Sequence, residues 1–338
     1  MTATSTVLIL GARGRLGGAA VRAFARAGWR VLAQVRPGAA VRALPGVQWL
    51  PVAPQDTQAL AAAARGASVV VHGLNPVYTQ QAWREQVPVL TQAAIDVTRA
   101  LGATLMLPGN VYNFGESMPA RLFENTPQRA DTLKGRLRIE AEARIHEATL
   151  DGAMTAVVIR AGDFFGGGTG SWFDQVLAKG LQRGRLTYPG AYGVPTAWAY
   201  LPDLARSFVQ VAQVRERLEP FENLHFSGHT LTGDDWADAL GPIAREQGWL
   251  APGRPLRTTS LPWPLLRLAG LVVPTLGALA EMRYLWRTPH ALVNRRMAAL
   301  VGPEPHTPLP EASRAALAEL GWLNTPQPFP HTTQEVQA

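Results

Sequence analysis

The chain of 338 residues contains no cysteine, which excludes disulfide bonds, thiolate zinc sites and cysteine nucleophiles. Lysine is almost absent, since Lys134 and Lys179 are the only two and the other basic residues are arginines. Long apolar runs are also lacking: residues 268–280 carry no charge but number only 13 and include a proline, too few to span a bilayer. This segment favours a buried helix pair over a membrane-surface contact, so membrane association is not expected.

The charge and the composition restrict the class of protein. The formal net charge is +7, but the arginines are spread along the chain instead of forming a block, so no nucleic-acid partner is expected. The first residues, MTATSTVLILGARG, have a short apolar run without a basic region before it, which does not fit a signal peptide and indicates a cytoplasmic protein. With 47% hydrophobic residues the chain can bury a sizeable core, and its length favours two domains or one large domain with an added lobe.

Strands and helices alternate through the first half. Short β-branched and aliphatic runs predict strands over residues 6–10, 29–35, 47–52, 68–72, 104–107 and 155–160. Helical spacing between them predicts helices over residues 16–27, 58–64, 83–101 and 132–150, with another over 234–247. Such alternation is typical of an α/β, doubly wound parallel sheet of the Rossmann type.

The segment GARGRLG follows the first predicted strand and supplies Gly11, Gly14 and Gly17. In a dinucleotide-binding βαβ unit, the first glycine permits a tight turn, the second lets the backbone approach a pyrophosphate, and the third lets the helix pack closely. The pyrophosphate then lies at the helix N-terminus. We therefore expect this loop and the start of its helix to bind a dinucleotide through residues Gly11, Arg13, Gly14, Arg15, Leu16 and Gly17.

The choice between NADP and NAD depends on charge at the end of the second strand. An NAD site usually has an acidic residue there, but this chain has Gln34, Val35 and Arg36. Arg36 and Arg13 are suited to bind a 2′-phosphate, because a planar guanidinium can make two parallel hydrogen bonds. NADP is therefore favoured over NAD, with the alternative that both arginines only reflect an arginine-rich chain.

Five segments follow one another over residues 5–230: GARGRLG, VVVHGLNP (69–76), LPGNVYNFG (107–115), VVIRAGDFFG (157–166) and AWAYLPDLARSF (197–208). In their order and spacing they resemble the extended short-chain dehydrogenase/reductase superfamily, in its NAD-dependent epimerase/dehydratase branch. The resemblance implies a Rossmann domain with a smaller, mainly helical C-terminal substrate lobe. It also implies that Asn75, Ala161 and Asp163 line the cofactor site.

The resemblance also identifies the catalytic positions, and all three are replaced. The family uses a Ser or Thr, a Tyr, and a Lys four residues after that Tyr. Aligning ENTPQRADTLKGRLRIEAE with the family segment puts Lys134 in the tyrosine position and Arg138 in the lysine position. The Ser/Thr position falls on Pro108. Arg138 keeps the charge that would hold the nicotinamide ribose, and Lys134 would need a lowered pKa to exchange a proton.

Neighbouring residues offer substitutes for the missing groups. Asn110 is placed to donate a hydrogen bond to a substrate carbonyl, and Tyr112 is a weaker candidate for a relocated proton donor. Asp163 either orients a substrate or only caps its turn. Arg136, between the two aligned cations, is expected to be solvated.

The second half is less informative. Residues 1–165 and about 196–228 are expected to form the cofactor domain, residues 166–195 and 229–325 the substrate lobe, and 326–338 a loose tail. Aromatics after residue 166 (Trp172, Phe173, Tyr188, Tyr192, Trp198 and Tyr200) either line an apolar pocket or pack the lobe. His225 and His229 lack the companions of a metal site, so no metal is expected.

The leading interpretation is an NADP-dependent oxidoreductase or epimerase-like enzyme for a small carbonyl or hydroxyl substrate. In it Lys134 orients or protonates the substrate, Arg138 holds the ribose and Asn110 polarises the carbonyl. The alternative is an NADP-binding sensor or scaffold without hydride transfer. A homodimer is possible in either case.

Overall fold

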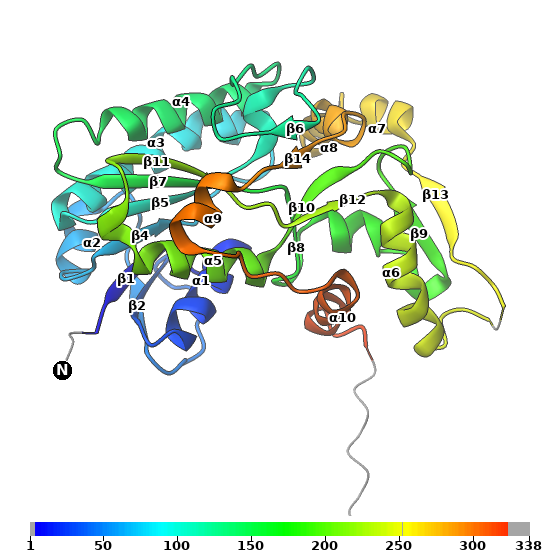
Figure 1. Cartoon of the computed structure of the whole chain (residues 1–338), viewed down its shortest axis with the longest axis horizontal. Helices are drawn as coiled ribbons and strands as arrows, with labels where there is room; N and C mark the ends of the chain where they lie inside the picture. Colours follow the sequence, from blue (N-terminus) through cyan, green and yellow to red (C-terminus); the bar gives the residue numbers. More distant parts are fainter. Residues whose placement is uncertain (1–3, 252, 324–338) are drawn as a thin grey trace, which may run out of the picture.

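The computed structural model describes residues 4–251 and 253–323, and its centre is a sheet of seven parallel strands (Figure 1). Their order across the sheet is β11-β7-β5-β4-β1-β2-β3. They are β1 (Thr6–Leu10), β2 (Arg30–Val35), β3 (Val47–Pro51), β4 (Val69–His72), β5 (Thr104–Gly109), β7 (Thr155–Arg160) and β11 (Phe221–His225). The chain runs outward from β1 to β3 and then returns past β1 to β4, so the switch point lies between β1 and β4. The predicted Rossmann-type fold is confirmed.

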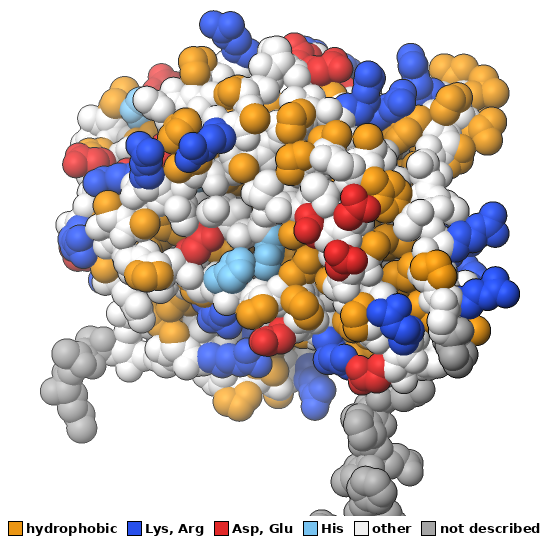
Figure 2. Space-filling view, turned by 45° about the vertical axis from the view of Figure 1, so that its right-hand side comes forward, with side chains coloured by type: hydrophobic (Ala, Val, Ile, Leu, Met, Phe, Trp, Pro, Cys, Tyr) orange, Lys and Arg blue, Asp and Glu red, His pale blue; other side chains and the backbone are white. Residues whose placement is uncertain are grey.

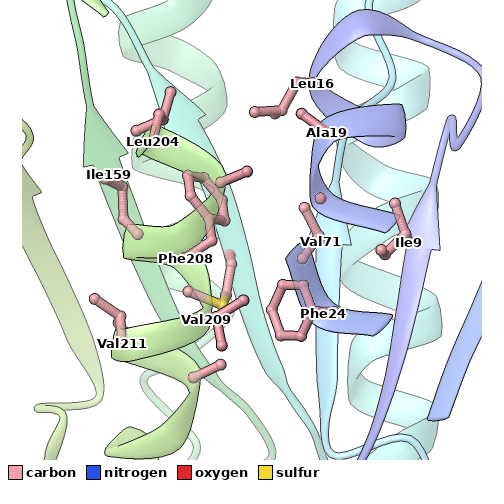
Figure 3. Packing of buried hydrophobic residues seen from close by; sticks show 14 of the residues in the cluster. Ile9, Leu16, Ala19, Phe24, Val71, Ile159, Leu204, Phe208, Val209 and Val211 are labelled. Carbon is pink, nitrogen blue, oxygen red and sulfur yellow. The ribbon is translucent and has the colours of Figure 1, made fainter. Parts of the chain in front are cut away.

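Helices cover both faces of this sheet (Figure 1). One face carries α1 (Arg15–Arg26), α5 (Leu201–Gln213) and α9 (Arg295–Val301), and the other carries α2 (Thr57–Ala63), α3 (Gln80–Leu101) and α4 (Leu133–Glu147). Figure 3 shows the first layer from close by, where Phe24 of α1 and Phe208 of α5 lie beside Val71 of the sheet. All five residues of β1 and all four of β4 are buried, as expected for parallel strands covered on both faces.

The predicted elements agree closely with the structure. All six predicted strands are present with ends within two residues, and the predicted helices end within three. The longest extension is at the start of α3, three residues earlier than predicted, and β5 continues two residues further, through Pro108 to Gly109.

The C-terminal lobe is mainly helical, as predicted, and also holds small sheets. Its helices are α6 (Gly233–Glu246), α7 (Trp263–Ala269), α8 (Pro274–Glu281) and α10 (Leu309–Glu319). The chain also contains five short helical turns. One is π-helical, η2 (Phe173–Leu177), and four are 3-10 turns: η1 (Val111–Phe114), η3 (Leu181–Arg183), η4 (Arg215–Arg217) and η5 (Met282–Trp286). Three strands pair in the order β12-β10-β8, namely β12 (His229–Leu231), β10 (Thr196–Tyr200) and β8 (Asp163–Phe165). Two further pairs are β9 (Arg185–Tyr188) with β13 (Arg257–Ser260), and β6 (Arg121–Leu122) with β14 (Ala291–Leu292).

The boundaries predicted between cofactor domain and lobe stay a prediction, and the whole of the predicted tail, 326–338, lies outside the described residues. The aromatic residues after residue 166 do have a clear place. Phe173, Tyr188, Trp198 and Tyr200 are buried in the core of the lobe together with Trp236, and Trp172 and Tyr192 pack against it. Trp198 meets Trp236 edge to face at 5.0 Å between ring centroids. The packing interpretation of these aromatics therefore accounts for most of them.

The expectation for residues 268–280 is correct in part and wrong in part. The segment forms part of a pair of helices, α7 and α8, but its outer side is not buried. Trp263 and Ala278 face the core, whereas Leu271 and Val272 are 82% and 84% exposed. Local packing buries only one side of two short helices, and no other described element covers the second side. Within residues 4–251 and 253–323, no helix is long and apolar enough to cross a membrane.

Candidate functional site

The glycine loop joins β1 to α1 with the geometry that its sequence predicts. Gly11 has φ +70°, and a Cβ added there would lie 3.0 Å from the backbone of Gly73 in the loop after β4. A Cβ added to Gly17 would lie 2.2 Å from the carbonyl oxygen of Gly11, so only glycine lets α1 pack this closely. Gly14 is the N-cap of α1 and has no capping side chain, which leaves the N–H groups of Arg15, Leu16 and Gly17 unbonded within the helix. The loop thus presents backbone donors at a helix N-terminus, the arrangement that binds phosphate groups.

The side chain of Gln34 holds the glycine loop through hydrogen bonds. It is 1% exposed, and its Oε1 accepts a hydrogen bond from the Gly11 N–H at 2.9 Å. Its Nε2 donates to the carbonyl oxygen of Val52 at 2.6 Å. The side chain therefore fixes the start of the glycine loop against the segment after β3, a role that sequence reasoning missed because it considered position 34 only as a missing carboxylate.

Arg13 and Arg36 lie where the sequence predicts cations for a 2′-phosphate. Both are exposed, and within the described part of the chain neither guanidinium has a hydrogen-bond or ion-pair partner. A backbone hydrogen bond from Ala12 to Gln34 ties the loop that carries Arg13 to the end of β2, which Arg36 follows. Both charges are therefore free to bind an anion beside the glycine loop.

The side chain of Arg15 crosses from the start of α1 to strand β8. Its Nη2 donates to the carbonyl oxygens of Phe164 at 3.2 Å and Gly166 at 2.8 Å. Burial lowers the pKa of Arg15, and the nearby carboxylates of Asp174 and Asp163 oppose that change. Arg15 thus links the glycine loop to the segment that leads into the C-terminal lobe.

Lys134 points toward α8. Its ammonium is 0% exposed and pairs with Glu281 Oε2 at 3.1 Å, while also donating to the carbonyl oxygen of Ala278 at 3.2 Å. The Nζ lies 4.7 Å from the ring centroid of Tyr78. Burial lowers the pKa of Lys134, and the attraction of Glu281 opposes this. Lys134 is therefore a paired cation that joins α4 to the C-terminal lobe.

Arg138, one turn further along α4, has different neighbours. Its Nη2 donates to Asn75 Oδ1 at 3.0 Å, and its guanidinium lies 5.2 Å from the ring centroid of Trp83. Burial lowers the pKa of Arg138, and Glu142 opposes that shift most strongly. The structure thus brings together two of the predicted cofactor residues, Asn75 and Arg138. Arg136, which lies between Lys134 and Arg138 in the sequence, is exposed, as predicted.

Two tyrosines and one aspartate form a polar cluster next to these cations. The hydroxyl groups of Tyr78 and Tyr112 are hydrogen-bonded, and burial raises the pKa of both. Burial also raises the pKa of Asp163 to about 7, against the opposing effect of Arg15. The charge of Asp163 raises the pKa of Tyr112 and opposes the lowering of the pKa of Arg15. Sequence reasoning gave Tyr112 a minor role and missed Tyr78, which no local motif distinguishes.

The predicted site residues Asn110 and Ala161, at this end of the sheet, make hydrogen bonds with some of their polar atoms. Asn110 caps η1 by accepting the Tyr112 N–H on its Oδ1 at 3.0 Å, which leaves its Nδ2 group without a partner among the described residues. Ala161 is completely buried and donates its N–H to the carbonyl oxygen of Gly109 at 3.2 Å. Pro108, the last residue but one of β5, offers no donor.

A buried ion pair fixes these elements relative to one another. Arg160, at the end of β7, donates to both carboxylate oxygens of Glu142 on α4, at 3.1 and 2.7 Å. It also donates to the carbonyl oxygen of Asn110 at 2.7 Å, and Asn113 donates to Glu142 at 3.0 Å. The turn η1 is thereby held against both α4 and β7, which positions Asn110 and Tyr112.

Histidines do not build a metal site in the described ranges. No group of three or more His, Asp or Glu side chains suited to a metal occurs in residues 4–251 or 253–323. His225 is buried, with Nδ1 3.2 Å from the carbonyl oxygen of Leu122, and His229 packs 4.5 Å from the ring of His306. Burial lowers the pKa of His72, at the end of β4, to about 3, so this ring is neutral beside Arg138.

Comparison with known proteins adds sequence similarity for the N-terminal part. The NmrA-like family matches residues 3–97, which include the glycine loop and the first four strands. No curated protein sequence matches the chain.

Solved structures are similar over nearly the whole chain. A putative epimerase from Burkholderia cenocepacia shares 17% identity with a TM-score of 0.71, covering 94% of this chain and 97% of that one. The UDP-glucose 4-epimerase from Brucella ovis, in complex with NAD, shares 16% identity with a TM-score of 0.70 over 94% of this chain and 99% of that one. The UDP-Glc/GlcNAc 4-epimerase from Campylobacter jejuni shares 13% identity with a TM-score of 0.69 over 93% and 98%. At these identities the similarity establishes the fold of both the sheet and the lobe.

Proposed function

We propose that this chain is a nicotinamide-dependent oxidoreductase or epimerase-like enzyme of the extended short-chain dehydrogenase/reductase type, acting on a small carbonyl or hydroxyl substrate. The observation that carries the proposal is the side chain of Arg15, which reaches from the glycine loop to β8 and donates to the carbonyl oxygens of Phe164 and Gly166, next to Asp163 at the start of that strand. A dinucleotide loop is therefore adjacent to groups able to exchange a proton. Several structural neighbours are epimerases, which supports the same class of reaction.

NADP is the proposed cofactor. The glycine loop fits a dinucleotide, because α1 follows its N-cap Gly14 without a capping side chain and so leaves its first backbone N–H groups free for a phosphate. Arg13 and Arg36 offer unpaired positive charge beside the loop, and no carboxylate ends β2. Five of the structural neighbours are complexes with NAD or NAD+, so NAD is the alternative to test.

The binding experiment compares the two nucleotides directly. We expect NADPH to bind more tightly than NADH, and Arg13→Ala/Arg36→Ala to weaken NADPH binding about tenfold or more while leaving NADH binding within about twofold. The exposed Arg136→Ala serves as a matched control that removes a cation elsewhere. Equal affinity for both nucleotides in the unmodified protein would contradict the choice of NADP.

Each polar group of the site has a proposed part in the reaction. Bound NADPH would supply the hydride. Arg138, oriented by Asn75, would hold the nicotinamide ribose, and the free Nδ2 of Asn110 would donate a hydrogen bond to the substrate carbonyl. Lys134 would orient the substrate side of the site through its contact with Tyr78, since its ammonium is paired with Glu281. Tyr112 would donate the proton, because a tyrosine with a raised pKa stays protonated until a developing alkoxide accepts from it.

Measurements of turnover and NADPH binding in single variants separate these roles. We expect Tyr112→Phe to lower kcat about a hundredfold while the Kd for NADPH changes less than about twofold. Arg138→Ala is expected to weaken NADPH binding as well, and Lys134→Ala to abolish turnover. Wild-type turnover in Tyr112→Phe would remove Tyr112 from the reaction and leave Lys134 as the proton donor.

A cofactor-binding sensor or scaffold is the second candidate. It is favoured by Pro108 in the Ser/Thr position and by the ion-paired Lys134 in the tyrosine position. Tight NADPH binding without oxidation of NADPH across a broad set of aldehydes, ketones and nucleotide sugars would favour this function over the enzyme.

A further inference from the structure

The outer side of the α7–α8 hairpin carries an exposed group of large apolar side chains, here called the apolar tip. Its members are Leu265, Leu268, Leu271, Val272 and Val273, with exposed fractions of 65, 66, 82, 84 and 44%. Single exposed leucines are ordinary on protein surfaces, but five within nine residues form a continuous patch of the kind that marks an interaction site. Figure 2 shows hydrophobic side chains gathered at the upper right edge of the molecule, at the height of α7 in Figure 1.

The hairpin that carries this tip is firmly attached. Gly270 and Gly277 let its two helices meet closely, since a Cβ on Gly270 would lie 2.7 Å from the backbone of Gly277. At the base, Trp263 is buried and its Nε1 donates to the carbonyl oxygen of Pro189 at 2.6 Å. At the end of α8, Glu281 binds both the Leu133 N–H and Lys134. The tip therefore protrudes from an anchored hairpin, and its exposure is not the result of a detached helix.

The charges around the tip are positive. Arg267 is the only ionisable residue between Arg257 and Glu281, and it is exposed among the apolar side chains. Arg283 follows α8 and lies over the ring of Trp263 at 5.7 Å, and no ion-pair partner occurs for it among the described residues. Glu281, at the end of α8, is already paired with Lys134. Figure 2 shows Lys and Arg side chains directly beside the apolar group.

We propose that the apolar tip inserts into the interface of an anionic lipid bilayer, with Arg267 and Arg283 at the level of the lipid headgroups. Apolar side chains bordered by arginines match the layered chemistry of such a surface, where acyl chains lie beneath negative headgroups. A second copy of this chain fits less well, because its net charge of +7 would oppose association through a positively charged patch. The proposal is independent of the cofactor and of catalysis.

Vesicle co-sedimentation tests the proposal with the full chain. We expect binding to vesicles of about three parts phosphatidylcholine to one part phosphatidylglycerol, and at least about tenfold weaker binding to phosphatidylcholine alone. Raising the salt from about 0.1 M to about 0.5 M should weaken the binding to anionic vesicles. Leu271→Asp/Val272→Asp should reduce it by about tenfold or more, and Arg267→Gln should reduce both the binding and its salt dependence.

Leu150→Asp is the matched control. Leu150 is 74% exposed and lies just beyond the end of α4 opposite the one that contacts α8, so this variant also replaces an exposed apolar side chain by aspartate but away from the tip, with one added charge against the two of the double variant. It should bind vesicles like the unmodified protein, and all variants should keep the thermal unfolding midpoint within about 2 °C because the altered side chains are on the surface. Absence of binding to anionic vesicles, or equal binding by Leu271→Asp/Val272→Asp, would overturn the proposal. Self-association that the same double variant abolishes, without vesicle binding, would also overturn it and assign the tip to a second copy.

Discussion

Lys134 is a buried cation whose charge is balanced by one carboxylate. Glu281→Gln would leave the ammonium without its counter-ion, so we expect the free energy of unfolding to fall by about 2–3 kcal/mol. This is less than the loss for a pair fully removed from water, because Glu281 is 20% exposed. Chemical denaturation of the single variant measures the loss.

The double variant Lys134→Met/Glu281→Gln provides the control for this effect. It removes both charges and keeps a long apolar side chain, so it should recover most of the stability, to within about 1 kcal/mol of the unmodified protein. If the double variant is as unstable as the single one, the ion pair is not the cause of the loss.

Asp163 gives the site a predictable dependence on pH. Its pKa in the folded state is about 7, above that of an aspartate in an unfolded chain, so the folded state holds this proton more tightly. The stability contributed by the protonated group is present below about pH 4 and is lost as the pH rises through about 7. Asp163→Asn should remove this loss, which appears as a difference between the unfolding midpoints of the two proteins that grows from pH 5 to pH 8. A constant difference would show that Asp163 has an ordinary pKa.

At the level of elements, the close packing of α1 on the glycine loop requires that position 17 has no side chain beyond a hydrogen atom. Gly17→Ala would place a methyl group 2.2 Å from the carbonyl oxygen of Gly11, so the helix must shift, and we expect a loss of about 3 kcal/mol or more together with weaker nucleotide binding. Gly18→Ala is the matched control, because its Cβ would meet its nearest atoms at 3.5 and 3.6 Å. It should be neutral or stabilise α1 by about 0.5–1 kcal/mol, since alanine is the better helix former. Thermal unfolding and nucleotide titration of both variants check the pair, and similar behaviour of the two would contradict the packing argument.

The elements themselves could be predicted from the sequence, because their signals are local. Apolar runs such as TVLIL and TAVVIR define strands that are buried on both faces, and the glycines of GARGRLG follow from backbone geometry alone. Much of the candidate site could not be predicted in this way. Lys134 meets a carboxylate 147 residues away, and Tyr78 meets Tyr112 from a different element. Such partners are selected by tertiary packing, which no spacing rule in one sequence contains.

For the whole molecule, four buried histidines govern the response to acid. Burial lowers the pKa of His72 and His225 to about 3, and of His229 and His290 to about 4. The unfolded chain takes up protons on these rings near pH 6.5 while the folded chain does not, so stability falls as the pH drops from about 6.5 toward 4. Each ring contributes up to about 1.4 kcal/mol per pH unit, which outweighs the opposite effect of Asp163.

Denaturant unfolding at pH 7, 6 and 5 checks this slope. His290→Asn should reduce it by about one histidine's share, because the pKa of His290 is lowered to about 4. A slope that does not change in His290→Asn would mean that this ring titrates normally in the folded protein.

The hydrogen bonds of Gln34 restrict how this lineage can change its nucleotide preference over evolution. A carboxylate at position 34 would accept from Gly11 as the amide does, but its second oxygen would face the carbonyl oxygen of Val52 and repel it. Replacing glutamine by glutamate at position 34 would therefore destabilise the glycine loop, even though it would supply an acid on β2. Position 36 is exposed and unpaired, so acidic substitutions there avoid this cost. A homologue that has turned to NAD should keep an amide at position 34 and carry its acid at position 36.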